Sequence, residues 1–398
     1  MLVRERVIQA LEQQAGSFRG YQLAQHHDLD QCRQFLLEIA GWPSRRLADA
    51  LAGMPAPGAL PTAEHDAAGG AVIPFRTQWK NHEQARQWAM QVLMGRTTFA
   101  VDGSHIPPQR TMSIPVALIQ IGWYENRHQP GGAYEKDVMV EVLPPAELGA
   151  GAGADLEQGW DERISLRRYV REVERVIAYM QAHAGEDPPP VVFFDGSLIA
   201  SFAGRLSLEV QNAYASHTMR MVMASEDTGV PLIGYIDTSY ARDMVEMLRA
   251  AGGVCAGHLS DPILYAPLMR WGDRTPAYIC ARDDVVLSSY VDEASGRDFR
   301  RRICFTYLKT TADHPPARIE FPLWLLEAGR LDEVMDIVRA ETVVGNGYPY
   351  PLETADAVAV LTMEDRERFY ELFRQFAQRH DLPLRVSRKL LSKQQRRV

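Results

Sequence analysis

The sequence predicts an α/β fold in which helices flank a mixed central sheet. Short apolar runs of strand length alternate with segments whose apolar residues recur at helical spacing. The clearest strand is Val191–Phe194, whose four β-branched or aromatic residues indicate a strand buried on both faces. Helices are predicted on either side of it, over residues 166–184 and 206–225.

Composition places the chain among ordinary globular proteins. Of its 398 residues, 46% are hydrophobic and 24% charged, and the net charge of −8 argues against coating nucleic acid by bulk charge. The four cysteines are scattered with no Cys-x-x-Cys pair, so we expect neither a zinc cluster nor a disulfide framework. A reducing cytoplasm fits this pattern. We find no signal peptide and no stretch of transmembrane length, so we expect a cytoplasmic protein without membrane contact.

Three regions are predicted along the chain. Residues 1–95 form a helical region, with a Pro-, Ala- and Gly-rich loop at 53–70 and no chemical motif. Residues 96–380 carry the sheet, and their poorly periodic part at 126–163 is predicted to be a flexible insertion. Residues 381–398 form a basic tail, which is either a solvated end or a contact to phosphates. The predicted strands are Phe99–Asp102, Ser113–Trp123, Val191–Phe194 and Val230–Ile236, with further candidates at 285–287 and 302–308.

Two Asp-Gly-Ser segments carry the chemical prediction. Asp102 and Asp195 each follow an apolar run, and the Gly-Ser that comes next allows a sharp turn. Each carboxylate is therefore expected at the carboxyl end of a strand, where open α/β sheets place their ligands. Asp-Gly alone is an ordinary turn dipeptide. Its repetition in the same context indicates convergent carboxylates, as a divalent metal site requires.

A third carboxylate is expected on the helix before the second Asp-Gly-Ser segment, where Glu172 and Glu174 compete. Glu174 has Val170 four residues before it and Ile177 three residues after it, so we assign it to the buried stripe. Glu172 has an arginine at each of these spacings, which is typical of a solvated face. We choose Glu174, and the alternative is a surface Glu174 paired with a neighbour.

A fourth carboxylate, Asp356, lies within an otherwise apolar helix predicted over residues 352–362. Glu353, one turn earlier, is the more exposed of the two acids in this pattern. The alternative for Asp356 is a buried hydrogen-bonding residue near a helix start, where the dipole favours an anion.

Taken together, these segments resemble the NurA nuclease family. The resemblance covers about residues 95–365 and implies an RNase H-like core, a homodimer and a manganese-dependent nuclease. It also implies a partner, the hexameric ATP-driven DNA translocase HerA, with which such nucleases resect DNA ends. The matching stretches, in the family's order, are Ala100–Ser104, Phe194–Leu198, Arg318–Pro322 and Gly347–Leu352 with Ala355 and Asp356.

The resemblance implies roles for single residues as well. Asp102, Glu174 and Asp195 are expected as metal ligands, and Asp356 fills a position where the family has His or Asp. Tyr348 matches a family tyrosine near the site. Residues 1–95 and the Gly-Ala-rich segment have no match, and residues 236–238 depart from the more basic stretch expected there. The residues assigned to DNA binding are Ser104, Ser197, Arg388, Lys389 and Lys393.

The implied chemistry agrees with these residue types. Phosphodiester hydrolysis needs an activated water and a neutralised leaving oxyanion, which two divalent ions about 4 Å apart supply. An all-oxygen site suits Mn²⁺ or Mg²⁺. The resemblance further implies an exonuclease that processes DNA ends in double-strand break repair, and single-strand endonuclease activity is left open. The chain has no phosphate-loop motif, so processive movement on DNA needs a separate motor.

Two rival functions are weighed against this one. An aspartyl phosphotransferase commonly has a second Asp two residues after its nucleophile, where this chain has Ser104 and Ser197. A Gly-x-Ser-x-Gly nucleophile elbow is absent. The other rival is a non-catalytic nuclease-like subunit that binds DNA or a motor, and the presence of four candidate acids argues against it.

Overall fold

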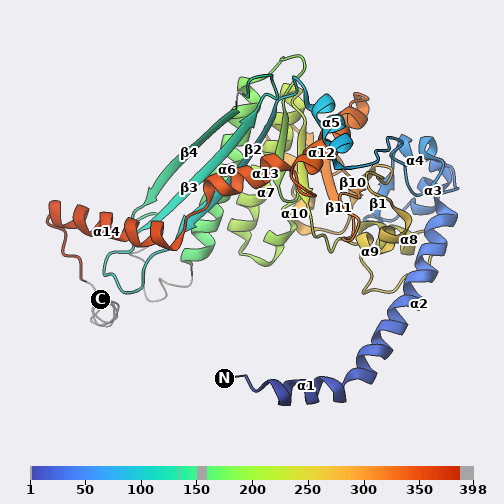
Figure 1. Ribbon diagram of the computed structural model, residues 1–398, viewed down its shortest axis with the longest axis horizontal. Coiled ribbons are helices and arrows are strands. Elements are labelled where there is room, and N and C mark those ends of the chain that lie inside the picture. Colours follow the sequence, from blue (N-terminus) through green and yellow to red (C-terminus); the bar gives the residue numbers. More distant parts are fainter. Residues whose placement is uncertain (1, 133, 150–158, 386–398) are drawn as a thin grey trace. The chain divides into compact units, whose positions relative to one another are not determined.

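The computed structural model describes residues 2–132, 134–149 and 159–385, apart from the side chains of residues 19 and 21–26 (Figure 1). The chain forms two compact units. The first is Met1–Gln78 with Tyr235–Leu323, and the second is Trp79–Gly234 with Trp324–Val398. The Gly-Ala run at 150–158 and the basic tail at 386–398 lie outside the described residues, and the predicted boundaries at 95 and 380 stay predictions.

A mixed sheet forms the centre of the second unit, as the sequence predicts. Strands β2, β3 and β4 form an antiparallel meander, and β5 pairs with β2 in parallel on the other side. The spatial order is β6-β5-β2-β3-β4. The strand bounds are β2 Thr98–Ile106, β3 Ala117–Asn126, β4 Tyr134–Leu143, β5 Val191–Asp195 and β6 Leu232–Ile236.

Two predictions about these strands are wrong. The first Asp-Gly-Ser segment does not turn, because β2 continues through it to Ile106 and Asp102 pairs with Gly122 of β3. Part of the predicted flexible insertion is β4, which pairs with β3 along its whole length. Its valines at 138, 140 and 142 alternate with other residues, and that period of two is the strand signal in an otherwise polar stretch.

Helices cover both faces of this sheet. Helix α6 (Trp160–Ala182) packs against β2 and β3, and helix α13 (Tyr350–Ala359) packs against the same two strands. Gly103 of β2 faces α6. Gly122 faces α13, and it is the register partner of Asp102, the residue next to Gly103. Because consecutive residues of a strand point to opposite faces of the sheet, the two helices lie on opposite faces. The other helices of this unit are α5 (His82–Leu93), α7 (Leu208–Thr228), α11 (Trp324–Glu327), α12 (Leu331–Val344) and α14 (Met363–Arg379).

The first unit combines a small antiparallel sheet with helices. Its strands lie in the order β1-β7-β10-β11, with bounds Gly58–Pro61, Tyr278–Ala281, Ile303–Leu308 and Ala317–Pro322. A separate pair is formed by β8 (Val291–Asp292) and β9 (Arg297–Asp298). Its α-helices are α1 (Arg4–Gln13), α2 (Ala15–Ile39), α3 (Ser44–Leu51), α4 (Ala63–Ala68), α8 (Asp243–Ala250), α9 (Asp261–Tyr265) and α10 (Val285–Ser288).

Three further predictions fail in this unit. The loop predicted at 53–70 contains β1 and α4. Residues 285–287, a strand candidate, start α10 because the Asp284 carboxylate accepts hydrogen bonds from the backbone N–H groups of Val286 and Leu287. Cys32 and Cys255 form a disulfide with a Cα–Cα distance of 4.9 Å, although no disulfide was expected. They are 223 residues apart, a pairing that spacing alone does not reveal.

The Arg318–Pro322 segment belongs to the core of the first unit. The Arg318 side chain is 2% exposed and donates hydrogen bonds to Asp243 and Glu320 at 3.0 and 2.7 Å. Its guanidinium also lies 3.9 Å from the Phe305 ring centroid. Removing one partner of such a buried pair leaves an uncompensated buried charge, which is strongly destabilising. This part of the family-like sequence therefore supports the fold.

None of the helices in the described part of the chain has a stretch that is both long and apolar enough to cross a bilayer.

Candidate functional site

Four elements of the second unit carry four acids that interact in pairs, Asp102 with Asp356, and Glu172 with Asp102 and Asp195. Asp102 lies in the middle of β2 and Asp195 at the end of β5, and the neighbouring residues Val101 and Phe194 are register partners. The two aspartates therefore occupy adjacent positions on neighbouring parallel strands. Glu172 comes from α6 on one face of the sheet, and Asp356 comes from α13 on the other.

Asp102 and Asp356 interact directly. Burial raises the pKa of Asp102 to about 6, and the hydrogen bond and negative charge of Asp356 act in the same direction. The backbone N–H of Gly103 and the charge of Arg168 oppose that rise. Two carboxyl groups that share a hydrogen bond need a proton or a cation between them, because two bare carboxylates repel each other. Asp356 itself is exposed, so the alternative of a buried residue is wrong.

Glu172, and not Glu174, reaches the other acids. Glu172 is 7% exposed, and burial together with the charges of Asp102 and Asp195 raises its pKa to about 7, while Arg168 lowers it. The Glu174 side chain is 42% exposed and pairs with Arg171 at 2.7 Å. The predicted helix phase, which put Glu174 on the buried stripe, is therefore wrong. The flanking arginines that suggested a solvated Glu172 include the partner that allows it to be buried.

Two glycines let the helices approach the strands closely enough. A Cβ on Gly103 would lie 2.3 Å from Oε1 of Glu172, so only glycine leaves room for that carboxylate. A Cβ on Gly122 would lie 2.7 Å from the backbone N of Ala359 in α13. Gln120 of the same strand donates hydrogen bonds to the Val358 and Ala359 carbonyls. This close packing of α13 on the sheet brings Asp356 next to Asp102.

The other predicted residues take varied positions. Ser104 lies in β2, half-buried, on the same side of the strand as Asp102. Ser197 follows the turn after β5, and its Oγ accepts a hydrogen bond from the Ile199 N–H at 3.0 Å. Tyr348 is half-buried in the turn just before α13, the helix that carries Asp356. The remaining ones, Arg388, Lys389 and Lys393, lie outside the described residues.

The donor set fits a divalent cation. Within residues 2–132, 134–149 and 159–385, no three His, Cys, Asp or Glu side chains are gathered closely enough to ligate one ion as they stand. The acids nevertheless interact pairwise. Burial is the main cause of the raised pKa values of Asp102 and Glu172, the neighbouring acids add to it, and a bound cation would oppose both effects. Carboxylate oxygens are the ligands that Mg²⁺ and Mn²⁺ prefer.

The sequence did not reveal the two residues that determine the position of Glu172, namely Gly103 and Arg168. The sequence pattern predicts a turn at Gly103, and Arg168 indicates a solvated helix face. The signal for Arg168 is its place four residues before Glu172, one helical turn away. The same spacing occurs on solvated helix faces, so the sequence does not distinguish the two environments.

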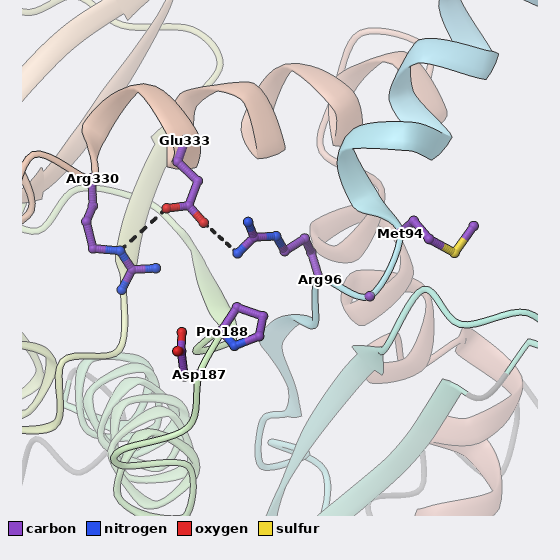
Figure 2. Close-up of a pocket in the computed structure, with 7 residues that line it drawn as sticks. Met94, Arg96, Asp187, Pro188, Arg330 and Glu333 are labelled. Carbon is purple, nitrogen blue, oxygen red and sulfur yellow. Dashed lines mark ion pairs between the residues drawn. The ribbon is translucent and has the colours of Figure 1, made fainter.

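A separate cavity of about 600 Å³ opens near the other end of the strands, where β2 and β5 begin. Figure 2 shows Arg96 and Arg330 both directed at Glu333. The Arg96 Nη1 to Glu333 Oε1 distance is 2.5 Å, and the Arg330 Nε to Glu333 Oε2 distance is 3.6 Å. The lining residues are Met94, Gly95, Arg96, Asp187, Pro188, Arg330 and Glu333, so the four clustered acids are not part of it.

The family model described as the NurA domain matches residues 96–361, well over half of the chain. A crystal structure of NurA with manganese is 9% identical, with a TM-score of 0.40 over 70% of this chain and 89% of that one. Another crystal structure of NurA has 9% identity and a TM-score of 0.43 over 70% and 88%.

The catalytic domain of human endonuclease V is 13% identical, with a TM-score of 0.30 over 79% of this chain and 93% of that one. The search of curated proteins finds no match.

Proposed function

The chain belongs to the NurA family, and from that premise we propose that it is a Mn²⁺- or Mg²⁺-dependent deoxyribonuclease acting on DNA ends. The observation that supports this proposal is the set of pairwise interactions among four acids, in which Asp102 interacts with Asp356, and Glu172 with Asp102 and Asp195. Arg168 offsets part of the repulsion among these groups, a bound cation would offset more of it, and metal-dependent phosphodiester hydrolysis needs clustered carboxylates.

The position of each acid determines its proposed role. Asp102 and Asp195 are fixed by paired strands, so they define where a cation would sit. Glu172 and Asp356 would hold it from the two faces of the sheet. When bound, one or two divalent ions supply an activated water and neutralise the leaving oxyanion. Tyr348 is proposed as a catalytic residue beside the acids. Ser104 and Ser197 are proposed to contact the DNA strand, and the basic tail with Arg388, Lys389 and Lys393 to contact its phosphates.

The proposal also covers the biological role of the protein. We place the protein in DNA end processing during double-strand break repair, as a cytoplasmic homodimer that works with a HerA-type ATP-driven translocase. The support is the family membership together with the missing phosphate-loop motif, because a nuclease that moves along DNA then needs an external motor.

The test is degradation of end-labelled duplex and single-stranded DNA with Mn²⁺, Mg²⁺ or EDTA, with and without the translocase. We expect cleavage with Mn²⁺ or Mg²⁺ and none in EDTA. A protein that binds Mn²⁺ and DNA but releases no labelled product under any condition would instead be the non-catalytic subunit.

A further inference from the structure

We propose that Arg168 is a positioning residue, which ties Glu172 to the backbone of β2 and so holds that carboxylate where a divalent cation would bind. The inference rests on the proposed function, since it presumes that the clustered carboxylates are metal ligands. It assigns a role to a side chain that carries no metal-ligating atom itself.

The geometry of Arg168 is that of a bridge. A single atom, Nη1, donates to Oε1 of Glu172 at 2.5 Å and to the Gly103 carbonyl oxygen at 2.9 Å. Arg168 and Glu172 are one turn apart on α6, whereas Gly103 lies on β2 next to Asp102. The bridge therefore fixes a helix-borne carboxylate to the strand that carries its neighbour in the acid cluster.

Gly103 completes this arrangement. A Cβ at that position would lie 2.3 Å from Oε1 of Glu172 and 2.9 Å from Cγ of Arg168. Both side chains therefore occupy the space that any other residue would fill. The position of Glu172 depends on an arginine that attracts it and on a glycine that leaves room for it.

Neighbouring arginines on the same helix show why Arg168 differs. Arg167 and Arg171 both pair with Glu141 of β4, a partly exposed acid that lies outside the cluster. Glu172, by contrast, is 7% exposed and feels the charges of Asp102 and Asp195. A buried carboxylate beside two other acids is repelled from its place, and removing its partner leaves an uncompensated buried charge.

Removing a group that orients a metal ligand typically lowers metal affinity by about 10–100-fold. The experiment is a calorimetric titration of the full-length protein with Mn²⁺ alone, accompanied by melting temperatures. Arg168→Gln should weaken Mn²⁺ binding by about 10–100-fold. Arg168→Lys, which keeps the charge, should recover part of the affinity. Arg171→Gln is the matched control and should bind Mn²⁺ as the wild type does.

Gly103→Ala perturbs the same carboxylate by a second route. The atom that the new Cβ would meet most closely, at 2.3 Å, is the carboxylate end of Glu172, which can move aside, and Cγ of Arg168 and Cδ1 of Ile121, both at 2.9 Å, must also shift. We expect a folded protein with weaker Mn²⁺ binding. This variant also decides the matter if Arg168→Gln does not fold.

The outcomes separate the two proposals. If the wild type binds Mn²⁺ and Arg168→Gln binds it equally well, or more tightly as a lost competitor would allow, the positioning role is refuted and the proposed function stands. A lower melting temperature with unchanged affinity would show a purely structural arginine. If the wild type binds no Mn²⁺ at all, the proposed function fails, and this inference fails with it.

Discussion

Asp102 and Asp356, which are 254 positions apart in the printed sequence, share a hydrogen bond between the middle of β2 and helix α13. The contact depends on Gly122, the register partner of Asp102, because α13 lies directly on that glycine. Two acids held together in this way destabilise the protein slightly unless a proton or a cation lies between them. This relationship leads to predictions about stability, metal binding and catalysis.

The first prediction concerns stability without metal. Asp102→Asn removes one of the repelling charges and keeps a hydrogen-bonding group opposite Asp356. In EDTA the variant should melt at the wild-type temperature or a few degrees above it, since about 1 kcal/mol corresponds to roughly 2–4 °C for domains of this size. Added Mn²⁺ should raise the melting temperature of the wild type only. Thermal unfolding followed by circular dichroism measures both effects, and equal Mn²⁺ stabilisation of the two proteins would contradict the assignment.

The second prediction is a comparison within one helix. Glu172→Gln should lower nuclease turnover by roughly 100-fold or more, because losing several kcal/mol of charge stabilisation costs tenfold for each 1.36 kcal/mol. Glu174→Gln, whose side chain is 42% exposed and paired with Arg171, should retain nearly full activity. Single-turnover cleavage at saturating Mn²⁺ measures both variants. A dead Glu174→Gln beside an active Glu172→Gln would show that the helix is rotated relative to this structure.

The third prediction concerns the packing of α13. The Cβ of Gly122→Ala would lie 2.7 Å from the Ala359 backbone N and 2.9 Å from the Val358 carbonyl carbon. Backbone atoms cannot move aside as side-chain ends can, so the helix must shift, at a cost of about 1–3 kcal/mol. We expect a lower free energy of unfolding in urea and weaker Mn²⁺ binding, because Asp356 moves with its helix. Gly70→Ala is the matched control, because Gly70, like Gly122, has no positive φ and its new Cβ would meet nothing within 4 Å.

The fourth prediction is a pH dependence away from the acid cluster. Burial raises the pKa of Glu341 to about 8 from an ordinary value of 4.5, while Thr98 donates it a hydrogen bond and His128 Nε2 lies 3.3 Å away. The folded state therefore holds a proton that the unfolded state releases above pH 4.5. The stability that comes from the neutral carboxyl is complete below pH 4.5 and is lost as the pH rises toward 8.

Glu341→Gln removes that titration. The free energy of unfolding of the wild type should fall relative to this variant between pH 5 and pH 8, by up to roughly 4 kcal/mol. Urea unfolding at several pH values measures the difference. The exposed Glu209→Gln should follow the wild type, and parallel curves for all three proteins would show that Glu341 is charged in the folded state.

The sequence predicts the position of Asp195 at the end of its strand, but it misplaces Asp102, which lies in the middle of β2. Val191–Asp195 is a buried strand ended by a carboxylate because its apolar run is uninterrupted and a glycine follows. Asp102 follows a similar run, but the turn expected after it does not form. Gly103 is needed there for a close approach of Glu172 and not for chain reversal. The same dipeptide serves two purposes, and only the partner strand β3 determines which one applies.

The helix-borne part could not be predicted in the same way. Glu172 and Glu174 differ by about half a turn, and apolar neighbours favoured the wrong one. The decisive factor is Arg168, whose pairing makes a buried Glu172 tolerable. Pairing across elements is a tertiary property, as is the disulfide between Cys32 and Cys255. The valines of β4 alternate with the period of two that is typical of a strand, but the charged residues in this stretch obscure that pattern.

The central claim is that the four acids form one metal site that cleaves DNA. Its most direct test is the Mn²⁺-dependent release of labelled nucleotide from end-labelled DNA by the wild type and by Asp102→Asn and Asp195→Asn, purified in parallel and shown to be folded. The account predicts cleavage by the wild type with Mn²⁺, none in EDTA, and a loss of at least about 100-fold in each variant. Wild-type turnover in either folded variant would contradict it.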